Sequence, residues 1–195
     1  MLLGDNNFKN KHYKYLKSVK SSKVSSACYD WLEMFAESIL LVVTLLIFVF
    51  RVVSVSGSSM MNTLFHADRL VIKKWYYEPR DGDIVVIRKG QNLDKPIIKR
   101  VIATEGQTLK IDYESGEIIV NGKTLSEPYI KEPMTTKGDI EVPVIIPKGY
   151  CYVMGDNRND SWDSRFAVVG LIRNEDVIGK AVFRIYPLDR IGNIS

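Results

Sequence analysis

The sequence predicts a mainly β protein, with curved antiparallel sheets or a barrel-like domain behind one N-terminal helix. Three observations support this prediction. A nearly uncharged run occupies residues 34–55, short β-branched segments recur after residue 60, and turn signals separate those segments. No stretch with helical periodicity and no repeat occurs in the second part, so a single domain there is the simplest interpretation.

The run from residue 34 to residue 55 has the length and composition of a transmembrane helix. Three polar residues interrupt it before Arg51, and two of them lie near its start. As a helix it would span about 33 Å, which matches a hydrocarbon core of about 30 Å. A cleaved signal peptide and a buried core helix are the alternatives; the long lysine-rich lead argues against the first and the uniformly apolar surface against the second.

The charge of the chain is concentrated before this run. Six lysines and two acidic residues occupy residues 1–30, so this tail accounts for the whole net charge of +4. One apolar run of this length predicts a single-pass protein of the cell membrane, and the positive-inside rule places its N-terminus in the cytoplasm and residues 56–195 outside. Its parts would be a cytoplasmic tail (1–30), a transmembrane helix (31–55) and an extracytoplasmic β-rich domain (56–195). Residues 31–195 are formally neutral, which argues against nucleic-acid binding.

The body contains seven candidate strands. Turn signals divide them, and Asn121-Gly122 lies within a stretch, residues 111–125, that reads as a hairpin followed by a further turn. The expected strands are 69–73, 83–87, 97–102, 108–112, 117–120, 142–146 and 150–154.

Ser59, in a small-residue turn just after the apolar run, is a candidate nucleophile that needs a base. The chain has two histidines and two cysteines, so no zinc-type cluster is expected. Lys99 is the candidate base, because strand alternation gives it the same face as Ile97 and Val101. Desolvation there would lower its pKa. The other interpretation is an ordinary lysine at a strand edge with its ammonium in water.

A dense polar run, Gly155–Arg165, follows the last predicted strand. A solvated loop would explain most of it. Asp and Arg at close spacing also suit a self-bonded loop that holds a neighbouring site rigid through bidentate ion pairs.

In order and spacing, these segments resemble bacterial type I signal peptidases (leader peptidases), Ser-Lys proteases that cut signal peptides from exported preproteins. Four boxes carry the resemblance. They are Ser59-Met60 with Thr63-Leu64, Gly82-Asp83-Ile84-Val85, Lys99-Arg100-Val101 and Gly155–Arg165. Each box alone is weak, whereas four in the right order behind an apolar run are highly specific.

The resemblance implies a role for each matched residue. Ser59 would be the nucleophile, Lys99 the general base, and the Ser161 hydroxyl would steady that base. It implies no metal or cofactor, preprotein signal peptides and the lipid bilayer as partners, and the secretion translocon as a candidate partner. The implied supporting residues are Asp163, Arg165 and Arg100, and those lining small P1 and P3 pockets are Met60, Leu64 and Ile98.

Several positions depart from the family pattern. Asn62 replaces the usual proline, Ile97 a frequent tyrosine, and residues 103–107 the common turn. Gly57 stands where some members have a serine that binds the oxyanion. The backbone N–H of Ser59 would then serve, with Ser58 or water as a second donor.

Three other functions compete with a signal peptidase. The departures are compatible with a membrane-anchored binding or scaffold domain without turnover. A self-cleaving, repressor-type Ser-Lys protein is disfavoured by the apolar run and by the lack of a DNA-binding segment. Catalysis by Ser59 with His66 is the remaining variant, although His66 has no obvious orienting partner.

Overall fold

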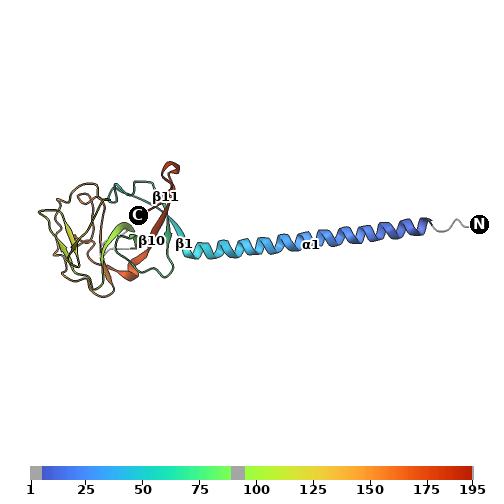
Figure 1. Cartoon of the computed structure of the whole chain (residues 1–195), viewed down its shortest axis with the longest axis horizontal. Helices are drawn as coiled ribbons and strands as arrows, with labels where there is room; N and C mark the ends of the chain where they lie inside the picture. The colour runs from blue at the N-terminus through green and yellow to red at the C-terminus, as the bar shows by residue number, and fades with distance from the viewer. Residues whose placement is uncertain (1–5, 89–94, 195) are drawn as a thin grey trace, which may run out of the picture. The chain divides into compact units, whose positions relative to one another are not determined.

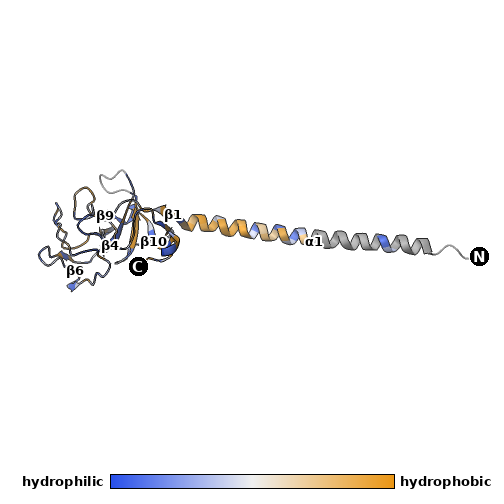
Figure 2. Ribbon diagram, turned by 90° about the horizontal axis from the view of Figure 1, so that it is seen from above, coloured by the Kyte–Doolittle hydropathy of each residue, from blue (hydrophilic) through white to orange (hydrophobic). Residues whose placement is uncertain are grey.

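The computed structural model describes residues 6–88 and 95–194, and the chain divides into two compact units, Met1–Ile47 and Phe48–Ser195. A single helix, α1 (Asn6–Val49), makes up the described part of the first unit. Its segment Cys28–Val49 is long and apolar enough to cross a membrane, and Figure 2 shows the apolar colouring of this part of α1.

The predicted end of the helix at residue 55 is wrong. The helix ends at Val49, and the next residues form β1 (Phe50–Ser54), which pairs antiparallel with β2 (Arg69–Lys73). Valines at positions 52 and 53 suit a strand as well as a helix, and pairing with β2 satisfies their backbone groups. The candidate span, Cys28–Val49, therefore starts three residues and ends six residues before the predicted transmembrane helix at 31–55.

The predicted antiparallel β fold is confirmed. The larger sheet is curled into a half-barrel in the order β1-β2-β10-β3-β4-β8-β9, with β11 paired to β10 (Figure 1). Register shifts in β10 and between β4 and β8 help it to curl. The further strands are β3 (Ile84–Ile87), β4 (Ile97–Thr104), β8 (Tyr150–Met154), β9 (Ile172–Arg173), β10 (Val177–Tyr186) and β11 (Gly192–Asn193).

A second sheet contains β5 (Leu109–Ile111), β6 (Ile118–Val120) and β7 (Lys123–Thr124), which confirms the predicted hairpin. Asn121 and Gly122 both have positive φ, as a two-residue hairpin turn requires. Two short 3₁₀ helices, η1 (Asn174–Asp176) and η2 (Leu188–Arg190), flank β10. Figure 1 shows this small sheet and β1 at opposite ends of the second unit.

The predicted strand at residues 142–146 is wrong. This segment makes only one isolated bridge, between Ile145 and Thr108. Pro143 lacks the N–H that a regular ladder needs, so the segment follows β5 without joining it as a strand.

Strand β4 separates two of the three core clusters. Val85 and Val101 belong to one cluster, whereas Met60 and Leu64 belong to another, against which Ile98 packs. Successive residues of β4 therefore face different clusters, as the alternation of side chains along a strand requires. The third cluster lies between the small sheet and β8.

Replacement of Ile118 by alanine tests the packing of the small sheet. Ile118 is fully buried, so Ile118→Ala should lower the free energy of unfolding by about 2–5 kcal/mol in urea titrations. Ile119, the next residue and only half-buried, is the matched control, and Ile119→Ala should lower it by clearly less. Equal losses would contradict the described burial.

Candidate active site

Ser59 lies in a loop that the core anchors on both sides. The loop is closed at its base by two hydrogen bonds, from Val55 N–H to the Asp68 carbonyl (2.8 Å) and from Ala67 N–H to the Val55 carbonyl (3.0 Å). Met60 and Leu64 are buried in the core, and the Leu64 N–H donates to the Met60 carbonyl (2.8 Å). Val55 before Ser59 and Met60 after it are therefore fixed in the core, and Ser59 is held between these two residues.

Lys99 reaches Ser59 from the middle of β4. Its Nζ donates to the Ser59 Oγ over 2.6 Å, and the lysine is only 3% exposed. Strand β4 is covered by β3 on one side and β8 on the other, with Val85 opposite Lys99. Because Lys99 is buried and β4 is an inner strand of the sheet, the structure excludes an ordinary lysine at a strand edge with its ammonium in water.

Burial lowers the pKa of Lys99 from 10.5 to about 8. The carboxylates of Asp163 and Asp156 act in the opposite direction, because a nearby negative charge favours the ammonium. Desolvation prevails, so a substantial fraction of Lys99 is neutral in mildly alkaline solution and can accept a proton.

The polar run 155–165 holds the Ser59 loop from the other side. The Asn157 N–H donates to the Ser59 carbonyl (3.0 Å), and the Asn157 side-chain amide donates to the Ser58 carbonyl (3.2 Å). Gly155 permits this approach, because a Cβ there would lie 2.4 Å from the Ser59 carbonyl oxygen and 2.3 Å from Ser161 Oγ. The run is therefore a self-bonded loop against the site, not a solvated one.

Three buried arginines hold this run in shape. Each makes two hydrogen bonds to one carboxylate, and none is more than 3% exposed. Such pairs fix geometry, and loss of one partner leaves an uncompensated buried charge, which costs about 3–5 kcal/mol. The pairs are Arg100 with Asp156, Arg158 with Glu127 and Arg165 with Asp163.

The arginines also bind backbone carbonyls that shape the site. Arg158 donates to the Gly155 carbonyl (3.0 Å), and Arg165 donates to the Arg158 carbonyl (2.6 Å). Arg100 donates to the Gly82 carbonyl (2.9 Å) and stacks on Tyr129, with its guanidinium carbon 3.8 Å from the ring centre. Arg100, Asp163 and Arg165 thus lie in the frame of the site rather than at the serine itself.

Ser161 lies beside the contact between Gly155 and the Ser59 carbonyl, and its hydroxyl has no hydrogen-bond partner among the described residues. It is 9% exposed, and within the described residues its Oγ makes no hydrogen bond, including none to Lys99. A Cβ on Gly155 would be close to both the Ser161 Oγ and the Ser59 carbonyl oxygen, so these two groups lie near each other. A steadying contact between Ser161 and Lys99 therefore stays a prediction.

A cleft of about 580 Å³ opens at Ser59 and Lys99. The three residues predicted to line substrate pockets do not line it: Met60 and Leu64 are buried in the core, and Ile98 packs against the same cluster. The alternation of side chains along β4 explains why Ile98 does not line the cleft: Ile97, and not Ile98, lies on the same face of the strand as Lys99. The lining residues are Gly57, Ser58, Ser59, Ile97, Lys99, Asp160, Trp162 and Val168.

Two groups could donate hydrogen bonds to an oxyanion at this site, the N–H of Ser59 and the hydroxyl of Ser58. Within the part of the chain that the structure describes, the N–H of Ser59 donates no hydrogen bond, so it is available to an oxyanion. The Ser58 hydroxyl donates to the Asp160 carboxylate. His66 accepts a long hydrogen bond from the Gly57 N–H (3.4 Å), so the structure pairs Ser59 with Lys99 and not with His66.

Sequence reasoning missed several residues of this site. Asp156, Arg158 and Asp160 lie inside the polar run and could have been found from it. Glu127 could not, because it lies 31 residues from its partner Arg158 and no local pattern marks it. Among residues 6–88 and 95–194, no group of three or more His, Cys, Asp or Glu side chains is arranged to hold a metal ion.

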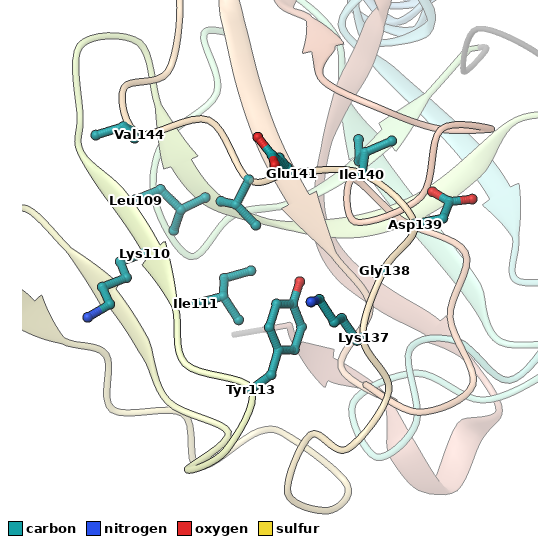
Figure 3. A pocket seen from close by; sticks show the side chains of 11 residues that line it. Leu109, Lys110, Ile111, Tyr113, Lys137, Gly138, Asp139, Ile140, Glu141 and Val144 are labelled. Atoms are coloured by element: carbon teal, nitrogen blue, oxygen red, sulfur yellow. The ribbon is translucent and has the colours of Figure 1, made fainter.

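A second cleft, of about 690 Å³, lies between the small sheet and residues 137–144 (Figure 3). Leu109 and Ile111 line one side of it, and the Lys137 ammonium lies 5.8 Å from the centre of the Tyr113 ring. It contains no nucleophile paired with a base, so the Ser59 cleft is the candidate active site.

Residues 28–186 match the family described as "Signal peptidase, peptidase S26". Signal peptidase I P of Bacillus subtilis subsp. natto is 34% identical over 182 residues, covering 88% of this chain and 96% of that protein. Probable signal peptidase I-1 of Synechocystis sp. is 38% identical over 152 residues, covering 72% of this chain and 74% of that protein. A crystal structure of a signal peptidase I from Enterococcus faecalis is 26% identical, has a TM-score of 0.46, and covers 53% of this chain and 97% of that one.

Gly155 offers a test of the close packing between the polar run and the Ser59 loop. Gly155→Ala should lower the free energy of unfolding by about 1–3 kcal/mol, because the new methyl group meets the Ser59 carbonyl. Gly192→Ala is the matched control, since nothing lies within 4 Å of a Cβ there. Unfolding in urea measures both, and a Gly155→Ala variant as stable as the control would contradict the packing.

Proposed function

The chain belongs to the signal peptidase family S26, and from this premise we propose that it removes signal peptides with a Ser59–Lys99 dyad while anchored in a membrane. The family makes it a serine peptidase, a hydrolase that acts on the signal peptides of preproteins. The single observation that carries the dyad is the 2.6 Å contact between Lys99 Nζ and Ser59 Oγ inside the fold.

The proposed mechanism follows from that contact. Neutral Lys99 accepts the proton of the Ser59 hydroxyl as Ser59 Oγ attacks the carbonyl carbon of the scissile bond. The tetrahedral intermediate collapses, the peptide C–N bond breaks, and the Lys99 ammonium gives its proton to the leaving amine. Lys99 then takes a proton from water, whose oxygen attacks the ester carbonyl of the acyl-enzyme. The second tetrahedral intermediate collapses, the bond from the carbonyl carbon to Ser59 Oγ breaks, and the Lys99 ammonium returns its proton to Ser59 Oγ, which releases the signal peptide with a free carboxylate.

The developing oxyanion needs donors in the cleft. The Ser59 N–H is the first, because no other group in the described residues uses it. The Ser58 hydroxyl lines the same cleft and is the second candidate, although it donates to Asp160 in the free protein. A donor of this kind contributes about 2.7–4 kcal/mol to lowering the barrier.

We expect a preference for small residues at P1 and P3. This expectation rests on the resemblance to the family, because Met60 and Leu64 are 2% and 0% exposed and lie outside the lining of the described cleft.

The membrane anchor is proposed from the apolar segment Cys28–Val49 and the lysines that precede it. The positive-inside rule predicts a cytoplasmic N-terminus and an extracytoplasmic cleft. Ser59 follows Val49 by ten residues, five of which form β1, so it lies at most about 36 Å along the chain from the helix end. Lipid and the secretion translocon, which would deliver preproteins at this surface, are the proposed partners.

Two substitutions test the dyad. Ser59→Ala should abolish cleavage of a preprotein by the full chain in detergent micelles, and Lys99→Met should lower kcat/KM by about 10²- to 10⁴-fold or more. Lys110→Met, at an exposed position of β5, is the control and should leave cleavage unchanged. Normal cleavage by either dyad variant would exclude this mechanism.

The pH dependence of cleavage provides a second test. Because the reactive Lys99 is neutral and its pKa is lowered to about 8, kcat/KM should rise about tenfold per pH unit below pH 8 and level off above it. A rise centred near the ordinary pKa of histidine, about 6.5, would instead indicate a histidine base.

A further inference from the structure

The cleft beside Ser59 contains one charge that the dyad does not use. Asp160 lines the cleft and is exposed, and Trp162 lines it two residues further on. Among the described residues that line the cleft, Lys99 is the only other one with an acidic or basic side chain, and it is neutral in the reactive form. The cleft that receives the substrate is therefore negatively charged, which favours positive and disfavours negative groups in the bound peptide.

The Asp160 carboxylate has room for a cationic partner. One of its oxygens accepts a hydrogen bond from the Ser58 hydroxyl, whereas a carboxylate offers about four acceptor positions. Within the described residues Asp160 takes part in no ion pair. Asp156 and Asp163, in the same run, are each paired with a buried arginine. Asp160 thus differs from its neighbours in being open to the cleft.

Trp162 adds a second group that attracts cations. Its side chain is 64% exposed although its ring packs on Phe166, with ring centres 4.8 Å apart. This contact fixes the indole while leaving much of it open beside the substrate. The face of an indole is the aromatic surface that binds ammonium and guanidinium groups best.

We propose that Asp160 and Trp162 form a subsite for a lysine or arginine side chain of the preprotein, close to the scissile bond. The proposal rests on the function proposed above and adds a charge preference to the expected small residues at P1 and P3. The cation belongs to P2, P1′ or P2′, since these residues lie next to the reacting carbonyl and P1 itself is expected to be a small residue.

A set of matched preproteins tests the subsite. Each carries lysine, glutamine or glutamate at P2, P1′ or P2′, and kcat/KM is measured with the full chain in a non-ionic detergent at low salt. At one of these positions wild type should prefer lysine to glutamate by about fivefold, the scale of an exposed ion pair, and the preference should shrink in high salt.

Two variants connect the preference to the proposed residues. Asp160→Asn keeps an acceptor for Ser58 but removes the charge, so the preference should fall to within about twofold of unity. Asp189→Asn, which removes an exposed carboxylate of η2 outside the cleft, should retain it. Trp162→Leu should lower cleavage of the lysine substrate more than that of the glutamine substrate, whereas Trp75→Leu should not.

The outcomes separate the two proposals. If wild type cleaves none of the preproteins, the proposed function fails. If it cleaves them without a preference for lysine at any of the three positions, or if Asp160→Asn keeps the preference, the subsite proposal is overturned and the proposed function stands.

Discussion

The rest of this structure depends on one interaction, the contact between the buried Lys99 side chain and the Ser59 hydroxyl. The lowering of the Lys99 pKa from 10.5 to about 8 corresponds to about 3 kcal/mol that the rest of the fold has to offset. Strand β4 makes this burial feasible because it lies between β3 and β8 and turns Lys99 toward the side shared by Ile97 and Val101. The same lysine on a solvated face of the sheet would keep its ammonium in water and its ordinary pKa.

The buried arginines limit how far the nearby carboxylates raise the pKa of Lys99. Asp156 and Asp163 lie close enough to raise the pKa of Lys99, yet each is bound in bidentate fashion by Arg100 or Arg165. The field that these carboxylates exert on Lys99 is therefore partly cancelled, and desolvation remains the larger effect. The frame thus does two things at once. It orders the loop that holds the Ser59 carbonyl, and it limits the negative charge that the base experiences.

Features that follow from local periodicity could be predicted from the sequence. Alternation along residues 97–102 was enough to put Lys99 on an apolar face, and Asn121-Gly122 was enough to predict a hairpin turn. Features that depend on distant pairing could not. Phe50–Ser54 suits a helix or a strand equally and becomes β1 only through β2. Strand β10 was missed because Gly179, Lys180 and Arg184 break its apolar pattern, and its stability comes from β2, β3 and β11. The partnership of Glu127 with Arg158 has no local signal at all.

Direct titration of Lys99 tests the central claim most directly. In full-length Ser59→Ala protein in micelles, with lysines labelled with ¹³C at Cε, the NMR signal of Lys99 can be identified from its absence in a Ser59→Ala, Lys99→Met double variant. The account predicts a titration midpoint for Lys99 near pH 8, well below the value of about 10.4 that is usual for a lysine in water. A Lys99 midpoint as high as that of the exposed lysines would contradict the account, because a lysine that stays charged cannot serve as the base for Ser59.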